Sequence, residues 1–291
     1  MPELPEVEVT RRRIEPHLVG RRIRTVRTTA ASYLFMTPPE TLRRRLRGRT
    51  TTALGRLGKY LIAELDDRRR LVIHLGMTGQ LFSQTASSLR LLAASTRQAL
   101  APEEQVDFRP DAHTHFRLAF DDDGPGVYFR DVRKFGKLLL LEPDERHPRL
   151  ERLGPDALEV HGELIFRASR KRRVPIKQLL LDQSLLAGVG NIYADEALFL
   201  SGVRPGRRAE RLTHRECDLL AEAVRRVLRR SIETGGSSIR DYVAPDGRDG
   251  AYQFERHVYA REGEACFACG SAVRKRVIAQ RGTHYCPTCQ K

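Results

Sequence analysis

Four of the five cysteines in this 291-residue chain form two Cys-x-x-Cys pairs near its C-terminal end. Cys266 and Cys269 make the first pair, sixteen residues follow, and Cys286 and Cys289 make the second. Two thiolate pairs at this spacing are typical of tetrahedral Zn²⁺ on a β-hairpin. Because four sulfur ligands leave no coordination position for water, we expect one structural zinc ion. Basic residues suited to a nucleic-acid-binding finger lie between the pairs, namely Arg274, Lys275, Arg276 and Arg281.

The first residues of the chain, Met1, Pro2 and Glu3, offer a second kind of chemistry. Initiator methionine is commonly removed before a small residue, which would leave Pro2 with a secondary α-amine. The pKa of an α-amino group is roughly 7.7–8.0 against about 10.4 for lysine, so far more of it is free base near neutral pH. An amine of this kind that attacks the anomeric carbon of a sugar forms a cationic iminium, which can drive elimination of the flanking phosphates. Glu3 is adjacent and can serve as a general acid or base.

The charge balance favours a polyanionic partner. Lys and Arg total 52 against 37 Asp and Glu, a formal net charge of +15, and each phosphate that a protein neutralises releases condensed counterions. Charge alone would equally fit a merely soluble basic protein. No apolar run reaches the length of a membrane span, so we exclude an integral membrane protein. The acidic N-terminus lacks the apolar core of a secretory leader, so we expect a cytoplasmic location.

The elements that must position these groups are indicated by the hydrophobic pattern. Residues from about 6 to 18 predict a helix. Short apolar runs between polar turns predict strands at 58–65, 71–75, 116–120, 127–130 and 137–141, and this succession favours a β-sandwich. Residues 83–112 are rich in Ser, Ala, Thr and Gln, and we expect them to form a long exposed loop insertion without chemistry.

A helical region follows the strand pattern. Thr213 and Glu216 predict a capping box, an apolar stripe continues to Ile232, and Gly235 with Gly236 ends the helix. The sequence therefore predicts an α+β multidomain protein. We expect an N-terminal β-sandwich with an N-terminal helix at 1–143, a helical domain at 155–250 and a zinc finger on a β-hairpin at 257–291.

Distinctive motifs are spread over nearly the whole chain. They read PELPEVE at 2–8, GKYL at 58–61, HLGMTG at 74–79, DVRKFG at 131–136, IK at 176–177 with GVGNIYADE at 188–196, and QRGTHYCPTCQ at 280–290. In this order they resemble the motifs of the bacterial formamidopyrimidine-DNA glycosylases of the Fpg/Nei family. Only residues 83–112 have no counterpart in the pattern.

The resemblance implies a bifunctional glycosylase and lyase that removes 8-oxoguanine and formamidopyrimidines from duplex DNA and cuts the strand by β,δ-elimination. Pro2 would be the Schiff-base nucleophile and Glu3 its acid/base partner. Lys59 would approach the damaged nucleotide and assist proton transfer. Glu6 and Glu196 match acidic positions that support the active site in this family. No catalytic metal or organic cofactor would be required.

The resemblance also implies how the damaged base is reached. An enzyme that acts on a base within a duplex must flip it out, which costs a few kcal/mol of unstacking. Met77, Arg133 and Phe135 would fill the vacated space and offset that cost. The donors of Arg133 suit the acceptor edge of the cytosine left without its partner.

The family's DNA-binding helices would lie at residues 177–196, which resemble a helix–two-turns–helix. Asn191 would bind a phosphate beside the lesion, joined by Lys177 and by Arg281 of the finger. Residues 235–242 would open a flexible loop that closes over the flipped base.

Two alternatives remain at this point. An endonuclease VIII-type enzyme prefers oxidised pyrimidines, but its start typically reads Pro-Glu-Gly-Pro, whereas this chain has Leu4. A non-catalytic lesion-binding zinc-finger protein would account for the charge and the cysteines but not for Pro2 and Glu3 together with Lys59. We expect a monomer that acts on damaged double-stranded DNA in a bacterial cytoplasm, associated with the nucleoid.

Overall fold

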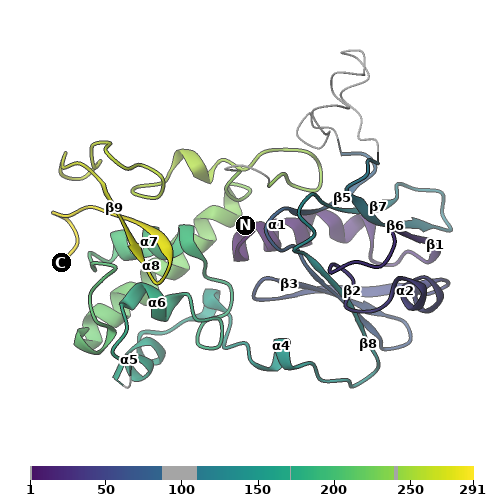
Figure 1. Cartoon of the computed structure of the whole chain (residues 1–291), viewed down its shortest axis with the longest axis horizontal. Helices are drawn as coiled ribbons and strands as arrows, with labels where there is room; N and C mark the ends of the chain where they lie inside the picture. Colours follow the sequence, from purple (N-terminus) through teal and green to yellow (C-terminus); the bar gives the residue numbers. More distant parts are fainter. Residues whose placement is uncertain (1, 87–109, 171, 239–241) are drawn as a thin grey trace, which may run out of the picture. The chain divides into compact units, whose positions relative to one another are not determined.

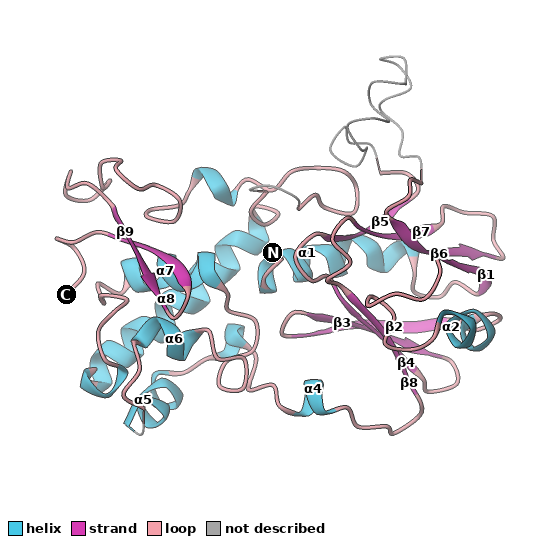
Figure 2. Ribbon diagram, in the orientation of Figure 1, coloured by secondary structure: helices cyan, strands magenta, loops and turns pink. Residues whose placement is uncertain are grey.

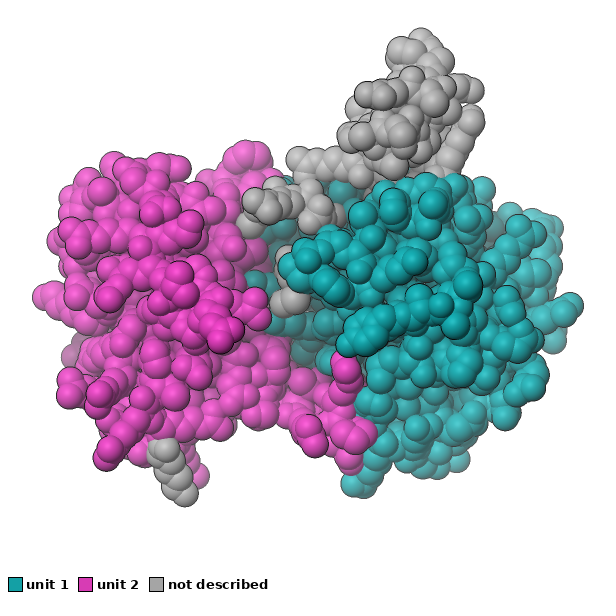
Figure 3. All heavy atoms as spheres, in the orientation of Figure 1, with its two compact units in different colours: residues 1–147, 234–251 teal, residues 148–233, 252–291 magenta. Residues whose placement is uncertain are grey.

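The structure is a computed structural model that describes residues 2–86, 110–170, 172–238 and 242–291. These residues fall into two compact units (Figure 3). Unit 1 comprises residues 1–147 with 234–251, and unit 2 comprises residues 148–233 with 252–291. Among the described residues, no helix combines the length and the apolar composition that a membrane crossing requires.

Unit 1 contains two four-stranded antiparallel sheets, which confirms the β-sandwich predicted from the sequence (Figure 1 and Figure 2). One sheet has the order β1 (Ile23–Thr28), β6 (Thr114–Phe120), β7 (Val127–Asp131), β5 (Gly79–Ser83). The other has the order β2 (Thr51–Leu57), β3 (Tyr60–Leu65), β4 (Arg70–His74), β8 (Lys137–Leu141). The motifs at 58–61, 74–79 and 131–136 lie at the ends of these strands. The two sheets therefore hold the residues of these motifs on a rigid frame.

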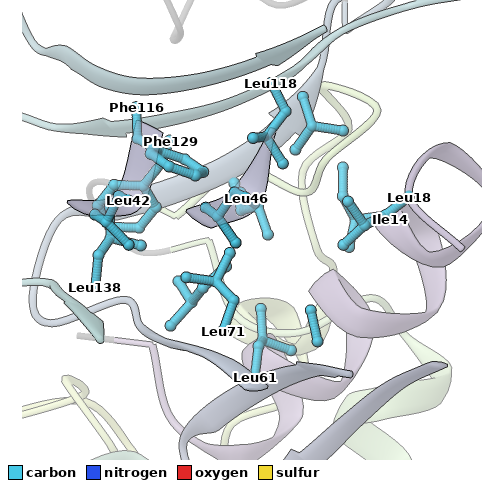
Figure 4. Close-up of a cluster of buried hydrophobic side chains, with 14 of the residues drawn as sticks. Ile14, Leu18, Leu42, Leu46, Leu61, Leu71, Phe116, Leu118, Phe129 and Leu138 are labelled. Carbon is cyan, nitrogen blue, oxygen red and sulfur yellow. The ribbon is translucent and has the colours of Figure 1, made fainter. Parts of the chain in front are cut away.

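The core of unit 1 is formed by buried side chains from both sheets and from two helices, α1 (Leu4–Ile14) and α2 (Pro39–Leu46) (Figure 4). Each Leu or Phe buried in this way stabilises the fold by roughly 1.5–3 kcal/mol relative to an exposed position. The side chains labelled in the figure are Ile14, Leu18, Leu42, Leu46, Leu61, Leu71, Phe116, Leu118, Phe129 and Leu138.

Helix α1 begins at Leu4, two residues before the start predicted from its apolar pattern. The reason is a capping box, in which the Glu3 side chain accepts the backbone N–H of Glu6 and the Glu6 side chain accepts that of Glu3. The helix contacts strands β2, β3 and β5 and continues into a single 3-10 turn, η1 (Glu15–His17). Pro2 and Glu3 are therefore the last residues before a helix that is packed on the sandwich.

Unit 2 contains helices and a C-terminal β-hairpin. Its longest helix, α8 (His214–Glu233), packs against α5 (Gly162–Arg170) and α7 (Asn191–Leu200). The predicted capping box at the start of α8 is confirmed, because Thr213 and Glu216 exchange hydrogen bonds of 2.8 Å and 3.2 Å. The remaining elements are α4 (Pro148–Glu151), η4 (Ala157–Glu159), α6 (Ile176–Leu180), η5 (Ala209–Arg211), η6 (Tyr252–Phe254), β9 (Arg274–Ile278) and β10 (Arg281–Tyr285).

Residues 234–251 group with unit 1 in the structure, whereas the sequence placed 234–250 in the helical domain at 155–250. The physical reason is a pair of hydrogen bonds to α1: the Ser237 N–H donates to the Glu6 carboxylate, and the Tyr242 hydroxyl donates to the Glu6 carbonyl. Of the expected loop insertion at 83–112, residues 87–109 lie outside the described part of the chain.

Candidate functional site

The start of α1 holds Pro2 and Glu3 in a buried position. Glu3 donates its backbone N–H to Glu6 Oε2 at 2.8 Å, and its carboxylate accepts the Glu6 N–H. The other carboxylate oxygen of Glu6 accepts the Ser237 N–H at 2.8 Å. Both the backbone and the side chain of Glu3 are thereby fixed next to Pro2, and Glu6 connects this site to the segment 234–251.

Lys59 lies in the turn between β2 and β3, and only 9% of it is exposed. Its side chain is therefore held by the protein rather than freely solvated. Gly58 before it has φ +55°, a backbone conformation that favours glycine. Arg56 donates to the Gly58 carbonyl at 3.0 Å and to Glu8 on α1 at 3.0 Å. The turn that carries Lys59 is thus attached to the helix that carries Pro2.

Glu8 on α1 is surrounded by three arginines, two from the same helix and one from β2. Its carboxylate accepts hydrogen bonds from Arg11, Arg12 and Arg56. Burial alone would raise the pKa of Glu8, but the hydrogen bonds and charges of these guanidinium groups outweigh it and lower the pKa below its ordinary value. Glu8 is consequently held as a carboxylate.

Met77, Arg133 and Phe135 are brought together on two adjacent loops of unit 1. Met77 precedes β5 and is 40% exposed, and Phe135 in the β7–β8 turn is 43% exposed. The Arg133 guanidinium carbon lies 4.7 Å from the centroid of the Phe135 ring. These large side chains are on the surface rather than in the core, and their entry into a DNA duplex stays a prediction.

In unit 2 the structure brings together the residues expected to bind phosphate. Asn191 begins α7, and its side-chain amide donates to the Gly282 carbonyl at 3.0 Å. The Lys177 ammonium donates to the same carbonyl at 3.1 Å and to the Thr283 hydroxyl at 2.8 Å. Arg281, immediately before Gly282, is exposed. The hairpin tip and the start of α7 therefore share one hydrogen-bonded cluster.

Lys177 has protein partners in this structure, and its expected contact with a phosphate stays a prediction. Its side chain is 0% exposed, and its ammonium group forms an ion pair of 2.6 Å with the equally buried Asp195. These contacts enclose the ammonium group within unit 2. Lys177 joins α6, α7 and β10, and so holds the residues around Arg281 in place.

Glu196 is also fully buried, and it accepts the backbone N–H groups of His257, Val258 and Tyr259 at 2.8–2.9 Å. It therefore anchors the segment that leads into the finger. This explains its burial in unit 2, whereas its expected support of the active site stays a prediction.

The four finger cysteines have the geometry of a zinc site. Their Sγ atoms all lie within 4.8 Å of one another, with Cys266 and Cys289 at 3.9 Å and Cys269 and Cys286 at 3.4 Å. A Zn–S bond of about 2.3 Å in a tetrahedron gives sulfur–sulfur distances of about 3.8 Å. The cluster therefore fits the predicted structural Zn²⁺, and all four ligands belong to the finger.

The expected flexible loop lies partly outside the described residues, since 239–241 are not described. Gly235 and Gly236 have φ +82° and +87°, values that favour glycine and end α8. Closure of this loop over a base stays a prediction.

Sequence reasoning missed several residues that hold the site. Asp131 and Asp195 lie inside the motifs at 131–136 and 188–196, but neither their type nor their spacing predicted a role for them. One sequence signal could have found these two residues, namely a carboxylate directly beside a residue that must be placed accurately. Such a carboxylate accepts backbone N–H groups and so fixes the chain next to it. Arg56, two residues before Gly58, carries no such signal.

Known protein families match the three regions of the chain that carry these residues. Residues 1–138 match the model of the formamidopyrimidine-DNA glycosylase N-terminal domain, 153–243 that of its H2TH domain, and 263–291 that of a zinc finger found in FPG and IleRS. The formamidopyrimidine-DNA glycosylase of Thioalkalivibrio sulfidiphilus is 42% identical over 298 residues, with 100% of both chains covered.

Two solved structures are similar over 100% of both chains. A mutant Lactococcus lactis Fpg in complex with DNA containing Fapy-dG has 35% identity and a TM-score of 0.85. A MutM in complex with DNA containing carbocyclic 8-oxo-G has 35% identity and a TM-score of 0.84. These matches confirm the resemblance read from the motifs: the chain belongs to the formamidopyrimidine-DNA glycosylase family.

Proposed function

We propose that this chain is a DNA glycosylase and lyase that removes oxidised purines, namely 8-oxoguanine and formamidopyrimidines, from duplex DNA. The observation that carries the proposal is the buried start of α1, where hydrogen bonds to Glu6 fix Glu3 beside Pro2. Family membership supports it, because related proteins are solved with DNA that contains Fapy-dG or carbocyclic 8-oxo-G.

Pro2 is the nucleophile once Met1 is removed. Attack of its nitrogen on C1′ of the damaged nucleotide breaks the glycosidic bond, and the base leaves with a proton from a general acid. The C1′–N bond becomes an iminium as the sugar ring opens. This electron sink allows the 3′ and then the 5′ phosphate to be eliminated, and hydrolysis of the iminium frees the amine. Glu3 transfers the protons because its carboxylate is fixed next to Pro2.

Lys59 assists these proton transfers from the β2–β3 turn. The brace of Arg56 between Gly58 and Glu8 supports this role, because it fixes the turn relative to α1.

Met77, Arg133 and Phe135 fill the space left by the flipped base. Their exposure and the stacking of Arg133 on Phe135 support this role. Filling the gap offsets an unstacking cost of a few kcal/mol.

Asn191 and Arg281 bind phosphates of the damaged strand, and the zinc ion holds the hairpin that presents Arg281. The shared contact at Gly282 supports a single phosphate-binding surface in unit 2. Lys177 acts indirectly, through its contacts with Gly282 and Asp195. We further propose that the protein acts as a monomer in the bacterial cytoplasm, at the nucleoid.

The second candidate function is the removal of oxidised pyrimidines. One experiment distinguishes it from the removal of oxidised purines. Borohydride trapping is performed on duplexes that carry 8-oxoguanine opposite cytosine and, in parallel, thymine glycol. The matched control is the same protein with an N-terminal extension that blocks the Pro2 amine.

We expect a covalent adduct on 8-oxoguanine DNA that disappears when the amine is blocked. Preferential trapping on thymine glycol would assign the chain to the pyrimidine-specific branch. Tight binding with no adduct on either duplex would leave only a lesion-binding role.

A further inference from the structure

Asp131 is a fully buried carboxylate at the end of β7. Its Oδ1 accepts the hydroxyl of Thr78 and, at 3.2 Å, the backbone N–H of Arg133. Its Oδ2 accepts the backbone N–H of Gly136 at 2.7 Å. One side chain therefore receives hydrogen bonds from two separate loops of unit 1.

The backbone of Asp131 is attached to the sheet. Its N–H donates to the His113 carbonyl at 2.9 Å, and its carbonyl lies 3.0 Å from His115 Nε2. It is also the β-sheet partner of Gly79, the first residue of β5. The carboxylate thus projects from a rigid position into the two loops.

The two loops are in backbone contact where they carry the exposed side chains. A Cβ atom on Gly76 would lie 2.5 Å from the carbonyl carbon of Phe135 and 2.5 Å from the Gly136 nitrogen. Lys134 has φ +56°, a strained conformation for a residue other than glycine. Such an arrangement persists only where its surroundings fix it, and the hydrogen bonds to Asp131 on either side of Lys134 do so.

We infer that Asp131 is the positioning residue for Met77, Arg133 and Phe135 and that it prepares them to fill the gap left by a flipped base. Its acceptors hold Thr78, next to Met77, and the N–H groups on both sides of Phe135. This inference rests on the proposed function and adds a residue that does not itself touch DNA.

Only a carboxylate can fill this position, and no other polar side chain of that size can. The Thr78 hydroxyl and the two backbone N–H groups all donate, so both oxygens must accept. In Asp131→Asn one oxygen becomes an NH₂ group, which faces a donor and loses at least one of these hydrogen bonds without a change in volume. Thr78→Val removes the hydroxyl alone and leaves the carboxylate in place.

The experiment compares two single-turnover rates at saturating enzyme. The first is excision of 8-oxoguanine opposite cytosine, which requires a base to be unstacked and replaced. The second is cleavage at a preformed abasic site opposite cytosine, where no base must be unstacked. We expect Asp131→Asn to lower the ratio of the first rate to the second by about ten-fold or more, since misplaced groups lose most of their effect. Thr78→Val should lower the ratio in the same direction.

The matched control is Thr37→Val. The Thr37 hydroxyl accepts the Leu140 N–H at 2.8 Å and donates to the Leu140 carbonyl at 3.5 Å in the same unit, and neither residue belongs to the two loops, so its loss removes buried hydrogen bonds as well. We expect this variant to leave the ratio unchanged.

Equal loss of both rates in Asp131→Asn and Thr78→Val would overturn the inference and assign Asp131 to stability alone. An unchanged ratio in both variants would overturn it too. If Asp131→Asn does not fold, Thr78→Val decides the question by the same ratio. Failure of the wild-type protein to cleave either duplex would instead contradict the proposed function itself.

Discussion

Arg56 and Glu8 form an ion pair at 3.0 Å in which both side chains are less than a tenth exposed. The same guanidinium donates to the Gly58 carbonyl, so the pair connects α1, which carries Pro2, to the turn that carries Lys59. Pro2 and Lys59, which we expect to act on the same sugar, therefore lie on segments that are joined by the buried ion pair of Arg56 and Glu8.

Replacement of Arg56 by Met should impair catalysis more than binding. The change removes hydrogen bonds to a buried carboxylate, at a cost of about 1.5–3 kcal/mol in stability, and it frees the Lys59 turn. We expect the single-turnover rate at an abasic site to fall by about ten-fold or more, with little change in the affinity for abasic DNA. Arg12→Met is the matched control, because Arg12 also donates to Glu8 but is 58% exposed. An equal effect of both variants on the rate would contradict the role given to Arg56.

The lowered pKa of Glu8 predicts a specific dependence of stability on pH. Since its pKa is lower in the folded than in the unfolded chain, Glu8 adds stability that is fully present above the unfolded value of about 4.3 and is lost as the pH falls through the folded value. The free energy of unfolding should therefore differ between the wild type and Glu8→Gln at pH 7, and the difference should shrink below about pH 4.3. Urea titrations across this range measure it, and a difference that stays constant with pH would contradict the assignment.

The buried pair of Lys177 and Asp195 predicts strong coupling within unit 2. Asp195→Asn leaves an enclosed ammonium group without its counter-charge, which should cost about 3–5 kcal/mol. Lys177→Met combined with Asp195→Asn should cost less than the sum of the single changes, as a double-mutant cycle in urea would show. Additive effects would mean that the two groups do not stabilise each other.

Zinc removal should weaken DNA binding while most of unit 2 stays folded. Cys289→Ser breaks the ligand set, so the hairpin no longer presents Arg281, and the slope of log K against log salt should decrease by about one phosphate contact. Zinc content and binding isotherms at several salt concentrations check this. Cys217→Ala is the control, because Cys217 lies outside the cluster. Loss of zinc with unchanged affinity and slope would contradict the role of the finger.

Short apolar runs between polar turns predicted β3, β4, β6, β7 and β8, whereas β1 and β2 were not predicted. In β1 the buried residues are Ile23 and Val26, and in β2 they are Thr51 and Leu54. Both strands have a register shift at their start, which places buried residues three apart instead of two. Buried residues three apart are typical of a helix, so a search for alternating apolar residues does not detect a short strand of this kind.

For the site residues too, the sequence predicted some features and missed others. The motifs named Lys177 and Arg133, but a motif cannot tell a side chain that contacts a ligand from one that supports its neighbours. The burial of Lys177 depends on Asp195 and on the hairpin more than a hundred residues away, as its contact with Thr283 shows. Such long-range packing is not present in local sequence patterns.

Adjacent residues of α7 hold the finger at both of its ends. Glu196 accepts N–H groups at the entry, residues 257–259, and Asp195 accepts the His284 N–H on the returning strand. Because both ends are attached to one turn of helix, residues 260–283 form a loop that is closed at its base by these hydrogen bonds. Part of the entropy cost of closing this loop is therefore met by α7, and a change of one residue at either attachment should disturb the finger more than an exposed substitution within the loop.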